Sequence, residues 1–235
     1  MASKNYRRKP ITKRKSNTAS KWIFYLISFV LLLFIAIGVY KFRDGFLYYL
    51  GFKTDKNVET LSKEERKLAD IRIYEVLHKH DDKAIGFDVS EYQSEIDWEQ
   101  TYHIDESFEL SFVFIRATAG KNKVDSRFKE NWKASKEREL IRGAYHYYRP
   151  NENSIEQAEN FIKTVKLQKG DLPPVLDIEK LPKSQSIDSL KVGLRRWLKK
   201  VEKHYKVKPI IYSGESYYTD FLKEEFSDYP LWIAN

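Results

Sequence analysis

The chain has 235 residues, a formal net charge of +8 and no cysteine, and 15% of its residues are aromatic. This length allows one or two domains, the aromatic content argues against general disorder, and the lack of cysteine excludes disulfides and thiolate metal ligands. The charge comes from the N-terminus: residues 1–40 hold eight basic and no acidic residues, whereas residues 41–235 hold 34 of each. A neutral body argues against nucleic-acid binding, which needs a basic patch on the folded domain.

Residues 22–40 form an uncharged run, WIFYLISFVLLLFIAIGVY. Its length suffices for one transmembrane helix, and Trp22, Tyr25 and Tyr40 stand near its ends as interfacial aromatics do. The basic tail 1–21 should stay in the cytoplasm, so the body faces outward. The sequence therefore predicts a single-pass protein of the cytoplasmic (inner) membrane. A cleaved signal peptide is the alternative, but the apolar run is unusually long for one and no A-x-A site follows it.

Residues 41–83 are interpreted as a juxtamembrane stalk. Ser62 and Glu65 form a capping-box pattern, and a loose apolar stripe follows, which together predict a short helix at about 62–79. His78 and His80 are interpreted as solvated rather than metal-bound, because residues two apart do not share a helix face.

From Ala84 onward, apolar strand-like runs alternate with amphipathic helical patterns. Strands are expected at 84–89, 111–117, 141–147, 174–179, 208–213 and 230–234. Helices are expected near 126–138, 154–166 and 186–204, with a shorter one near 215–224. This alternation is typical of parallel βαβ units, and continuous apolar strands are typical of a sheet covered on both faces. Residues 84–235 are therefore predicted to form one α/β domain.

Polar and aromatic side chains gather at the C-terminal ends of these predicted strands. They are Asp88, Ser90, Arg116, Thr118, Tyr145, His146, Tyr147, Asp177, Glu179, Tyr212, Ser213 and Asn235. In β/α barrels the active site lies at that end of the sheet. The pattern therefore predicts a functional site built from several strand ends.

The segment 173–179 reads as a short buried strand that ends in two carboxylates. Because successive strand residues point to opposite faces, Asp177 and Glu179 point the same way. Burial and mutual repulsion raise the pKa of one of two such groups, as a general acid near neutral pH requires. An isolated D-x-E pattern is more often a strand that runs into a solvated loop, so this interpretation depends on the rest of the chain.

A series of motifs resembles the family 25 glycoside hydrolases, the Chalaropsis-type lysozymes. The motifs are Gly86-Phe87-Asp88-Val89-Ser90, Gln93, Ile96-Asp97-Trp98, Phe114-Ile115-Arg116-Ala117-Thr118, Asp125, Phe128, Asn131, Ala134, Gly143-Ala144-Tyr145-His146-Tyr147, Pro174-Val175-Leu176-Asp177-Ile178-Glu179, Ile211-Tyr212-Ser213 and Leu231-Trp232-Ile233-Ala234. Each motif alone is weak, but their order and spacing are specific. The resemblance covers about 84–235.

The resemblance implies a modified β/α (TIM-like) barrel that hydrolyses the β-1,4 bond between N-acetylmuramic acid and N-acetylglucosamine in peptidoglycan. It implies that Glu179 is the proton donor, that Asp177 stabilises positive charge in the transition state, and that Asp88 shapes the cleft. Tyr145 matches a substrate-contacting tyrosine. No cofactor or metal is expected.

Other aromatic residues carry less definite expectations. His146, Tyr212 and Trp232 are expected to line the cleft, although His146 reads equally well as a core histidine. Core or rim positions are favoured for Trp98, Tyr147 and Tyr148.

Physical chemistry agrees with the implied roles. Glycosidases commonly flank the bond with two carboxyl groups, and Asp177 and Asp88 should both raise the pKa of Glu179. In the alternative, substrate-assisted route the sugar's own acetamido oxygen is the nucleophile and Asp177 orients it. The sequence leaves both routes open.

The sequence departs from the family pattern after its sixth strand. The family continues with two more strands, which carry a W-Q-Y-type segment and a further cleft aspartate, whereas this sequence stops at Asn235. Closure of an eight-stranded barrel is therefore not expected from these residues alone. A fragment of a longer protein is the favoured explanation; a truncated gene product and completion by another chain are the alternatives.

The leading functional prediction is a membrane-anchored muramidase of the cell wall. A non-catalytic peptidoglycan-binding or scaffold protein is the alternative, since it would tolerate missing strands. A hydrolase of another N-acetylated polymer, such as chitin, differs only in its substrate.

Overall fold

The computed structural model describes residues 22, 25–33, 62–101, 103–104 and 107–234. Residues 65–235 form one compact unit. The predicted tail 1–21 and Asn235 lie outside the described residues, as do residues 23–24 and 34–40 of the predicted membrane span. Residues 25–33 are helical. Among the described residues, no helix is both long and apolar enough to cross a bilayer.

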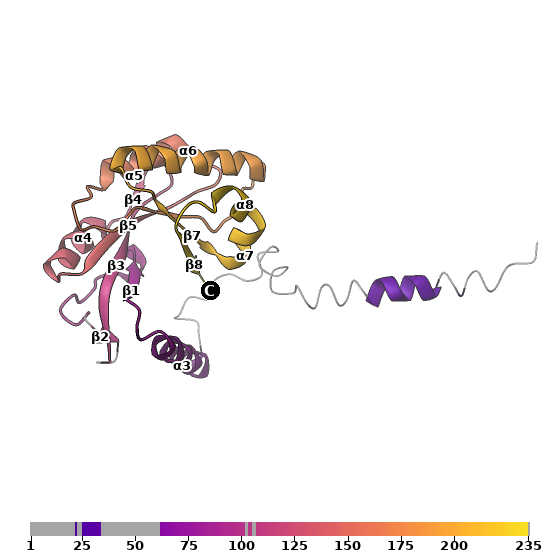
Figure 1. The fold of residues 1–235 in the computed structure, drawn as a ribbon, viewed down its shortest axis with the longest axis horizontal. Helices are drawn as coiled ribbons and strands as arrows, with labels where there is room; N and C mark the ends of the chain where they lie inside the picture. The colour runs from indigo at the N-terminus through magenta and orange to yellow at the C-terminus, as the bar shows by residue number, and fades with distance from the viewer. Residues whose placement is uncertain (1–21, 23–24, 34–61, 102, 105–106, 235) are drawn as a thin grey trace, which may run out of the picture. The chain divides into compact units, whose positions relative to one another are not determined.

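The compact unit is built on a curved parallel sheet (Figure 1). Neighbouring strands follow the order β1-β3-β5-β6-β7-β8, and each neighbouring pair is parallel. Their bounds are β1 Ile85–Val89, β3 Phe108–Ala119, β5 Ile141–Tyr147, β6 Val175–Asp177, β7 Ile210–Gly214 and β8 Leu231–Ala234. The six predicted strands and their parallel arrangement are confirmed.

Two further strands were not predicted. These strands, β2 (His103–Ile104) and β4 (Lys123–Val124), pair antiparallel with β3. Each has only two residues, so neither carries a period that a sequence pattern could reveal.

One helix, α3 Lys63–Lys79, precedes the first strand, and helices follow most of the strands, as the alternation predicts. The later helices are η2 Glu91–Gln93, α4 Phe128–Glu137, α5 Ser154–Thr164, α6 Ile187–Tyr205, α7 Glu215–Tyr217, the π-helical turn η3 Tyr218–Leu222 and α8 Lys223–Phe226. Side-chain caps start three of them: Ser90 accepts from the backbone N–H of Tyr92 in η2, Asn153 accepts from those of Ile155 and Glu156 in α5, and Ser186 accepts from that of Ser189 in α6. The helix predicted at 62–79 is confirmed as α3, and the rings of Tyr74 and His78 contact Phe108 of β3.

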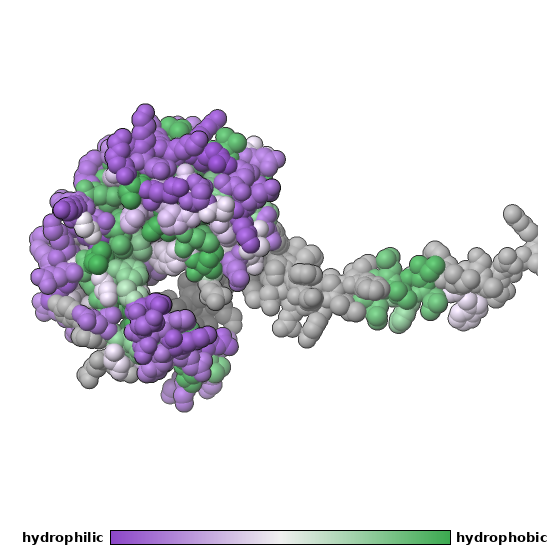
Figure 2. All heavy atoms as spheres, in the orientation of Figure 1, coloured by the Kyte–Doolittle hydropathy of each residue, from purple (hydrophilic) through white to green (hydrophobic). Residues whose placement is uncertain are grey.

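The main core lies between the sheet and its outer helices. In Figure 1, α5 and α6 lie along one side of the sheet, and Figure 2 shows mostly hydrophilic residues on their outward surface. Phe161 of α5 and Trp197 of α6 are fully buried, with ring centroids 5.5 Å apart. Large apolar side chains of this kind supply most of the stabilisation of such a layer. The fully buried large residues are Trp197, Tyr148, Phe161, Phe226, Ile115, Leu176, Ile178, Leu190, Leu194, Leu198, Leu222 and His146.

A second set of side chains fills the concave interior of the sheet. Phe114 contacts Trp232 of β8 across this interior, with ring centroids 5.0 Å apart. The rings of Phe112 and Phe114 fit because Gly86 and Gly143 face them: a Cβ on either glycine would lie 2.3 Å from the ring. These rings form a floor beneath the C-terminal ends of the strands.

Candidate active site

The end of β6 is held in place by its neighbouring strands. The backbone N–H of Tyr148 donates to the carbonyl of Asp177 (2.8 Å), and that of Ile178 donates to the carbonyl of Tyr212 (3.0 Å). The Ser213 hydroxyl then donates to the carbonyl of Ile178 (2.7 Å). The backbone that carries the two acids therefore has little freedom to move.

A cavity of about 240 Å³ opens above this strand end. Its lining residues are Asp88, Ser90, Tyr92, Gln93, Arg116, Tyr145, Tyr147, Val175, Asp177, Glu179, Tyr212 and Trp232. They come from β1, η2, β3, β5, β6, β7 and β8, from the junction between β1 and η2, and from the loop that follows β6. The structure thus brings together all but one of the seven residues predicted to form the site, in the place where parallel α/β folds bind ligands.

Asp177 is the most buried carboxylate of the cavity, with 5% of its surface exposed. Burial raises its pKa well above the ordinary value, and the charge of Glu179, a hydrogen bond with Glu179 and the charge of Asp88 raise it further. Arg116 opposes these effects. Two interacting carboxyl groups release their protons as a pair, so Asp177 and Glu179 together retain one proton to a higher pH than a lone carboxylate would.

One oxygen of Asp177 has no partner. Its Oδ1 atom is buried and makes no hydrogen bond with any residue that the structure describes. A buried acceptor without a donor is costly, and such atoms are rare in folded proteins. Asp177 lines the cavity, so an N–H or O–H group of a bound molecule is one source of the missing donor.

Asp88 and Tyr145 complete the polar wall. Asp88 is accessible to solvent at the mouth of the cavity, while the atoms around its carboxyl group desolvate it and raise its pKa. Burial raises the pKa of Tyr145 strongly, and the charges of Asp88 and Asp177 add to this effect. The Tyr145 hydroxyl therefore remains protonated and available as a hydrogen-bond donor at any physiological pH.

His146 does not line the cavity, contrary to the expectation for this residue. It is fully buried on the opposite face of β5, where its ring stacks on Trp197 with centroids 5.5 Å apart. Its two ring nitrogens lie 2.7 Å from the Thr118 hydroxyl and 3.1 Å from Oε1 of Gln157. Burial lowers its pKa to about 4, so the ring is neutral at physiological pH. The core interpretation of His146 is therefore the correct one.

The alternation of side chains along β5, which turns His146 toward the helices, places Tyr147 in the cavity. Tyr145 and Tyr147 are two residues apart on β5 and both line it, whereas Tyr148 and Trp98 belong to the core. Tyr147 was expected in the core or rim; the signal that locates it is its parity with Tyr145. On the far wall, Tyr212 and Trp232 make an edge-to-face contact with ring centroids 4.8 Å apart.

Arg116 forms the base of a charged cluster beside the carboxylates. Its side chain is 8% exposed and pairs with Asp125 (2.7 Å) and with Glu91 (3.0 Å). The guanidinium carbon lies 4.5 Å from the ring centroid of Tyr92. The sequence placed Arg116 at a strand end but gave no reason to add Glu91 and Tyr92, because the contacts that unite them join distant parts of the chain.

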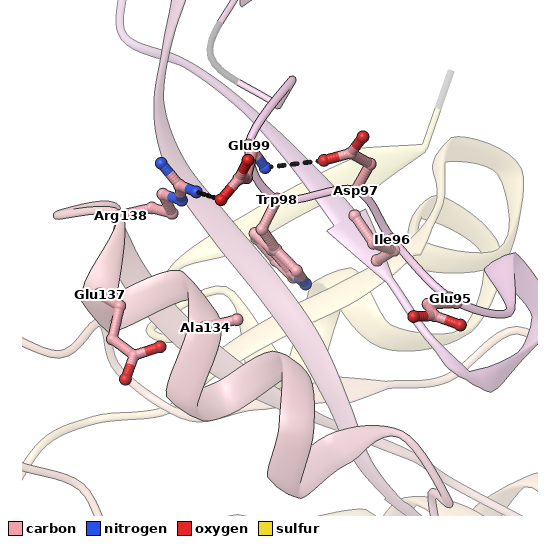
Figure 3. Close-up of a pocket in the computed structure, with 8 residues that line it drawn as sticks. All are labelled: Glu95, Ile96, Asp97, Trp98, Glu99, Ala134, Glu137 and Arg138. Carbon is pink, nitrogen blue, oxygen red and sulfur yellow. Dashed lines mark hydrogen bonds and ion pairs between the residues drawn. The ribbon is translucent and has the colours of Figure 1, made fainter.

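A separate hollow lies between α4 and residues 95–99 (Figure 3). Its lining carries four acidic side chains around Trp98, and Arg138 pairs with Glu99 at 3.2 Å. It contains none of the residues predicted to form the site. Across the described part of the chain, no group of three or more histidine, aspartate or glutamate side chains is arranged to hold a metal ion.

Comparison with known proteins identifies the family. The model of the glycosyl hydrolases family 25 matches residues 87–235. The uncharacterized protein YegX of Escherichia coli strain CFT073 is 44% identical over 151 residues, which are 64% of this chain and 55% of YegX. Lysozyme M1 of Streptomyces globisporus is 33% identical over 162 residues, 64% of this chain and 54% of that protein. The chain thus spans about half the length of these curated relatives.

Solved structures agree with this match. A family 25 glycosyl hydrolase from Bacillus anthracis superposes with a TM-score of 0.59 and is 32% identical, and the match covers 64% of this chain and 70% of that one. The curved parallel sheet and the carboxylate-lined cavity at its C-terminal end occupy the same region that the family model matches. The chain belongs to the glycosyl hydrolases family 25.

Proposed function

We propose that the chain is a lysozyme that hydrolyses the β-1,4 bond between N-acetylmuramic acid and N-acetylglucosamine in peptidoglycan. The observation that carries this proposal is the pair Asp177 and Glu179, which share one face at the end of β6 inside an aromatic-lined cavity. Membership of family 25 and the likeness to a relative named Lysozyme M1 support the choice of substrate.

Glu179 acts as the general acid in this proposal. It is less buried than Asp177 and lines the cavity, so it is the member of the pair that reaches the glycosidic oxygen. As the bond between the anomeric carbon and that oxygen breaks, Glu179 gives its proton to the leaving oxygen. In the second step the resulting carboxylate takes a proton from the attacking water, as microscopic reversibility requires.

Asp177 stabilises the positive charge that develops on the sugar. The unpartnered Oδ1 of Asp177 further supports the substrate-assisted route, in which the carboxylate accepts the N–H of the acetamido group. This contact turns the acetamido oxygen toward the anomeric carbon, where it forms the covalent bond that water later breaks. In this proposal the Tyr145 hydroxyl, which lines the same cavity, donates a hydrogen bond to the bound sugar, and Asp88 adds negative charge at the mouth of the cavity.

The aromatic walls suit a carbohydrate. Tyr147, Tyr212 and Trp232 present ring faces and edges to the cavity, and such surfaces pack against the C–H faces of pyranose rings. We further propose that residues 22–40 anchor the protein in the cytoplasmic membrane, so that this cavity acts on the wall outside. The uncharged run and the basic tail before it support this location.

The decisive experiment is reducing-end release from purified peptidoglycan, with the parent chain compared with its Glu179→Gln variant. Glutamine keeps the size and hydrogen-bonding capacity of the side chain but holds no transferable acidic proton. We expect turnover to fall by a factor of about 100 to 10,000, the typical contribution of a general acid. Binding of glycan fragments should persist.

Two controls sharpen this experiment. Glu159→Gln alters an acid on the outer helix α5, which is 58% exposed and pairs with Lys200 at 2.7 Å, and should leave turnover unchanged. Chitin oligomers, offered in place of peptidoglycan, test the substrate. A folded parent that binds glycan without cleaving it would overturn the enzymatic proposal in favour of a binding protein.

A further inference from the structure

Tyr92 is a large aromatic side chain displayed at the mouth of the cavity. It lies in the middle of η2 and lines the cavity, yet 79% of its surface is exposed to solvent. Single exposed hydrophobic residues are ordinary on a protein surface and need no explanation. What sets Tyr92 apart is the amount of buried, charged structure that surrounds its short turn.

The turn itself is closed by a capping box. The backbone N–H of Ser90 donates to Oε1 of Gln93 (2.8 Å), and the backbone N–H of Tyr92 donates to the Ser90 hydroxyl (3.3 Å). At the end of the turn Ser94 has a φ of 58°, a conformation that non-glycine residues seldom adopt. Such a residue persists only where its surroundings fix the backbone.

The ring of Tyr92 rests on a buried cation. The guanidinium carbon of Arg116 lies 4.5 Å from the centroid of the Tyr92 ring. Arg116 cannot turn away, because Asp125 and Glu91 hold two of its nitrogens at 2.7 Å and 3.0 Å. One face of the ring is therefore occupied, and the opposite side of Tyr92 is left to the solvent at the cavity mouth.

Residues on both sides of Arg116 anchor the turn to the rest of the domain. The backbone N–H of Glu91 donates to Oδ2 of Asp125 (2.9 Å), across 34 residues of sequence. Against the effect of burial, hydrogen bonds from Ser126 and the charge of Lys123 lower the pKa of Glu91 to about 2, so it stays ionised. This cluster supplies no group to the proposed acid chemistry. Its structural effect is to hold Tyr92 in one position.

We propose that Tyr92 is a stacking platform for a sugar ring of the glycan chain beyond the disaccharide at the scissile bond, and that Arg116, Asp125 and Glu91 position it. This inference rests on the proposed function and deepens it. A pyranose ring presents axial C–H groups whose slight positive charge is attracted to the negative face of an aromatic ring. A ring that is already fixed loses little conformational entropy when the sugar arrives. Tyr92 would thereby favour long glycan strands over short fragments.

The test measures glycan binding without turnover, by isothermal titration calorimetry of the full chain carrying Glu179→Gln. The ligands are the peptidoglycan disaccharide and its tetrameric and hexameric saccharides, prepared free of peptide. Adding Tyr92→Ala should weaken hexasaccharide binding roughly tenfold, the loss of about one stacking contact, and leave disaccharide binding unchanged. Tyr92→Phe, added to Glu179→Gln, should bind as the Glu179→Gln chain does, because phenylalanine keeps the ring.

Two further variants separate stacking from simple coverage of Arg116. Tyr92→Leu still covers the guanidinium but has no π face, so it should bind the hexasaccharide as weakly as Tyr92→Ala. Glu91→Gln loosens the turn while keeping the ring, and should give a smaller loss that again depends on saccharide length. Thermal melts of each variant confirm that the domain remains folded.

Several outcomes would overturn the inference. If Tyr92→Ala binds the hexasaccharide undiminished, the stacking inference is contradicted but the proposed function is not. The same holds if Tyr92→Ala weakens binding of the disaccharide and the hexasaccharide equally. Parent-like binding by Tyr92→Leu would show that coverage of Arg116, not stacking, is the role of Tyr92. A parent that binds no saccharide of any length contradicts the proposed function itself and this inference with it.

Discussion

At the scale of single residues, the buried carboxyl group of Asp177 lowers the stability of the fold and is suited to a chemical role. Asp177 is buried beside Glu179, its pKa is raised, and its Oδ1 has no partner among the described residues. Such a carboxyl group is destabilising when it ionises, because burial disfavours the charged form. A residue of this kind is expected where a function requires it rather than where folding does.

Replacing Asp177 by Asn should therefore stabilise the protein at neutral pH while abolishing its turnover. Because the folded-state pKa is raised above 3.8, the native state binds more protons than the unfolded state above that pH. The stability that protonation supplies is full at lower pH and is lost as the pH rises through the folded-state pKa. Asparagine stays neutral, so its advantage grows with pH. Thermal melts at pH 4, 5.5 and 7.5 should show that the variant's melting temperature exceeds the parent's by the largest margin at pH 7.5. Each kcal/mol of added stability corresponds to about 2–4 °C in a domain of this size.

Asp171→Asn is the matched control for this prediction. Asp171 pairs with Arg142 at 2.9 Å, and both side chains are less than 10% exposed. Removing that charge leaves a buried arginine without its partner and should lower the melting temperature. If Asp177→Asn melts at or below the parent at pH 7.5, burial of the carboxylate is not the cost inferred here.

At the scale of elements, the sheet depends on two glycines that admit aromatic rings. A Cβ on Gly86 would lie 2.3 Å from the Phe112 ring, and the ring belongs to the neighbouring strand β3. Gly86→Ala should therefore destabilise the domain by about 1–3 kcal/mol, the usual cost of overpacking. Adding Phe112→Leu should recover part of that loss, because the smaller side chain vacates the space.

Gly214→Ala provides the comparison for Gly86→Ala. Nothing lies within 4 Å of a Cβ at that position, and its φ of −66° suits any residue. Urea denaturation of the two single variants and of the double variant measures the three free energies of unfolding. Equal stability of the two alanine variants would refute the steric explanation, as would a double variant that shows no recovery.

Much of this architecture follows from periods in the sequence. The alternation of strands with helices predicts the parallel sheet, and the two-residue period places Asp177 and Glu179 together. The same period, applied to β5, places Tyr145 and Tyr147 in the cavity and His146 outside it, so that signal was present in the sequence. Contacts between distant residues leave no such period, as between Glu91 and Asp125. The register shift between Arg116 and Thr118 likewise interrupts the period of β3 and turns Thr118 toward His146.

At the scale of the whole molecule, charge divides the chain into two parts. All of the net charge lies in residues 1–40, and the remainder is neutral. A basic tail before an uncharged run is the arrangement that retains a tail on the cytoplasmic side of a membrane. The proposed anchor and the proposed wall hydrolase are therefore separable by a deletion.

The full chain should sediment with membranes and resist extraction by high salt, whereas a chain that lacks residues 1–40 should stay in the supernatant. Leu31→Lys combined with Leu32→Lys places two charges within the apolar run, at about 2.5–3.5 kcal/mol each, and should also release the protein. Immunoblots of fractionated cells measure the distribution. Recovery of the unaltered full chain in the soluble fraction would contradict the anchor, and a shortened product would indicate cleavage instead.

The alternation along β5 also bears on how such a chain can change over generations. Tyr145 and Tyr147 face the cavity, whereas Ala144 and His146 lie against the helices. Adjacent codons are therefore under different selection: one set for the lining of the cavity and the other for packing of the core. Under the proposed function, a substitution at a cavity codon alters which glycans are accepted and leaves the helix-facing layer unchanged. Sugar preference can therefore drift among descendants while their folding is inherited intact. Directed evolution confined to codons 145, 147, 212 and 232 would sample that drift directly.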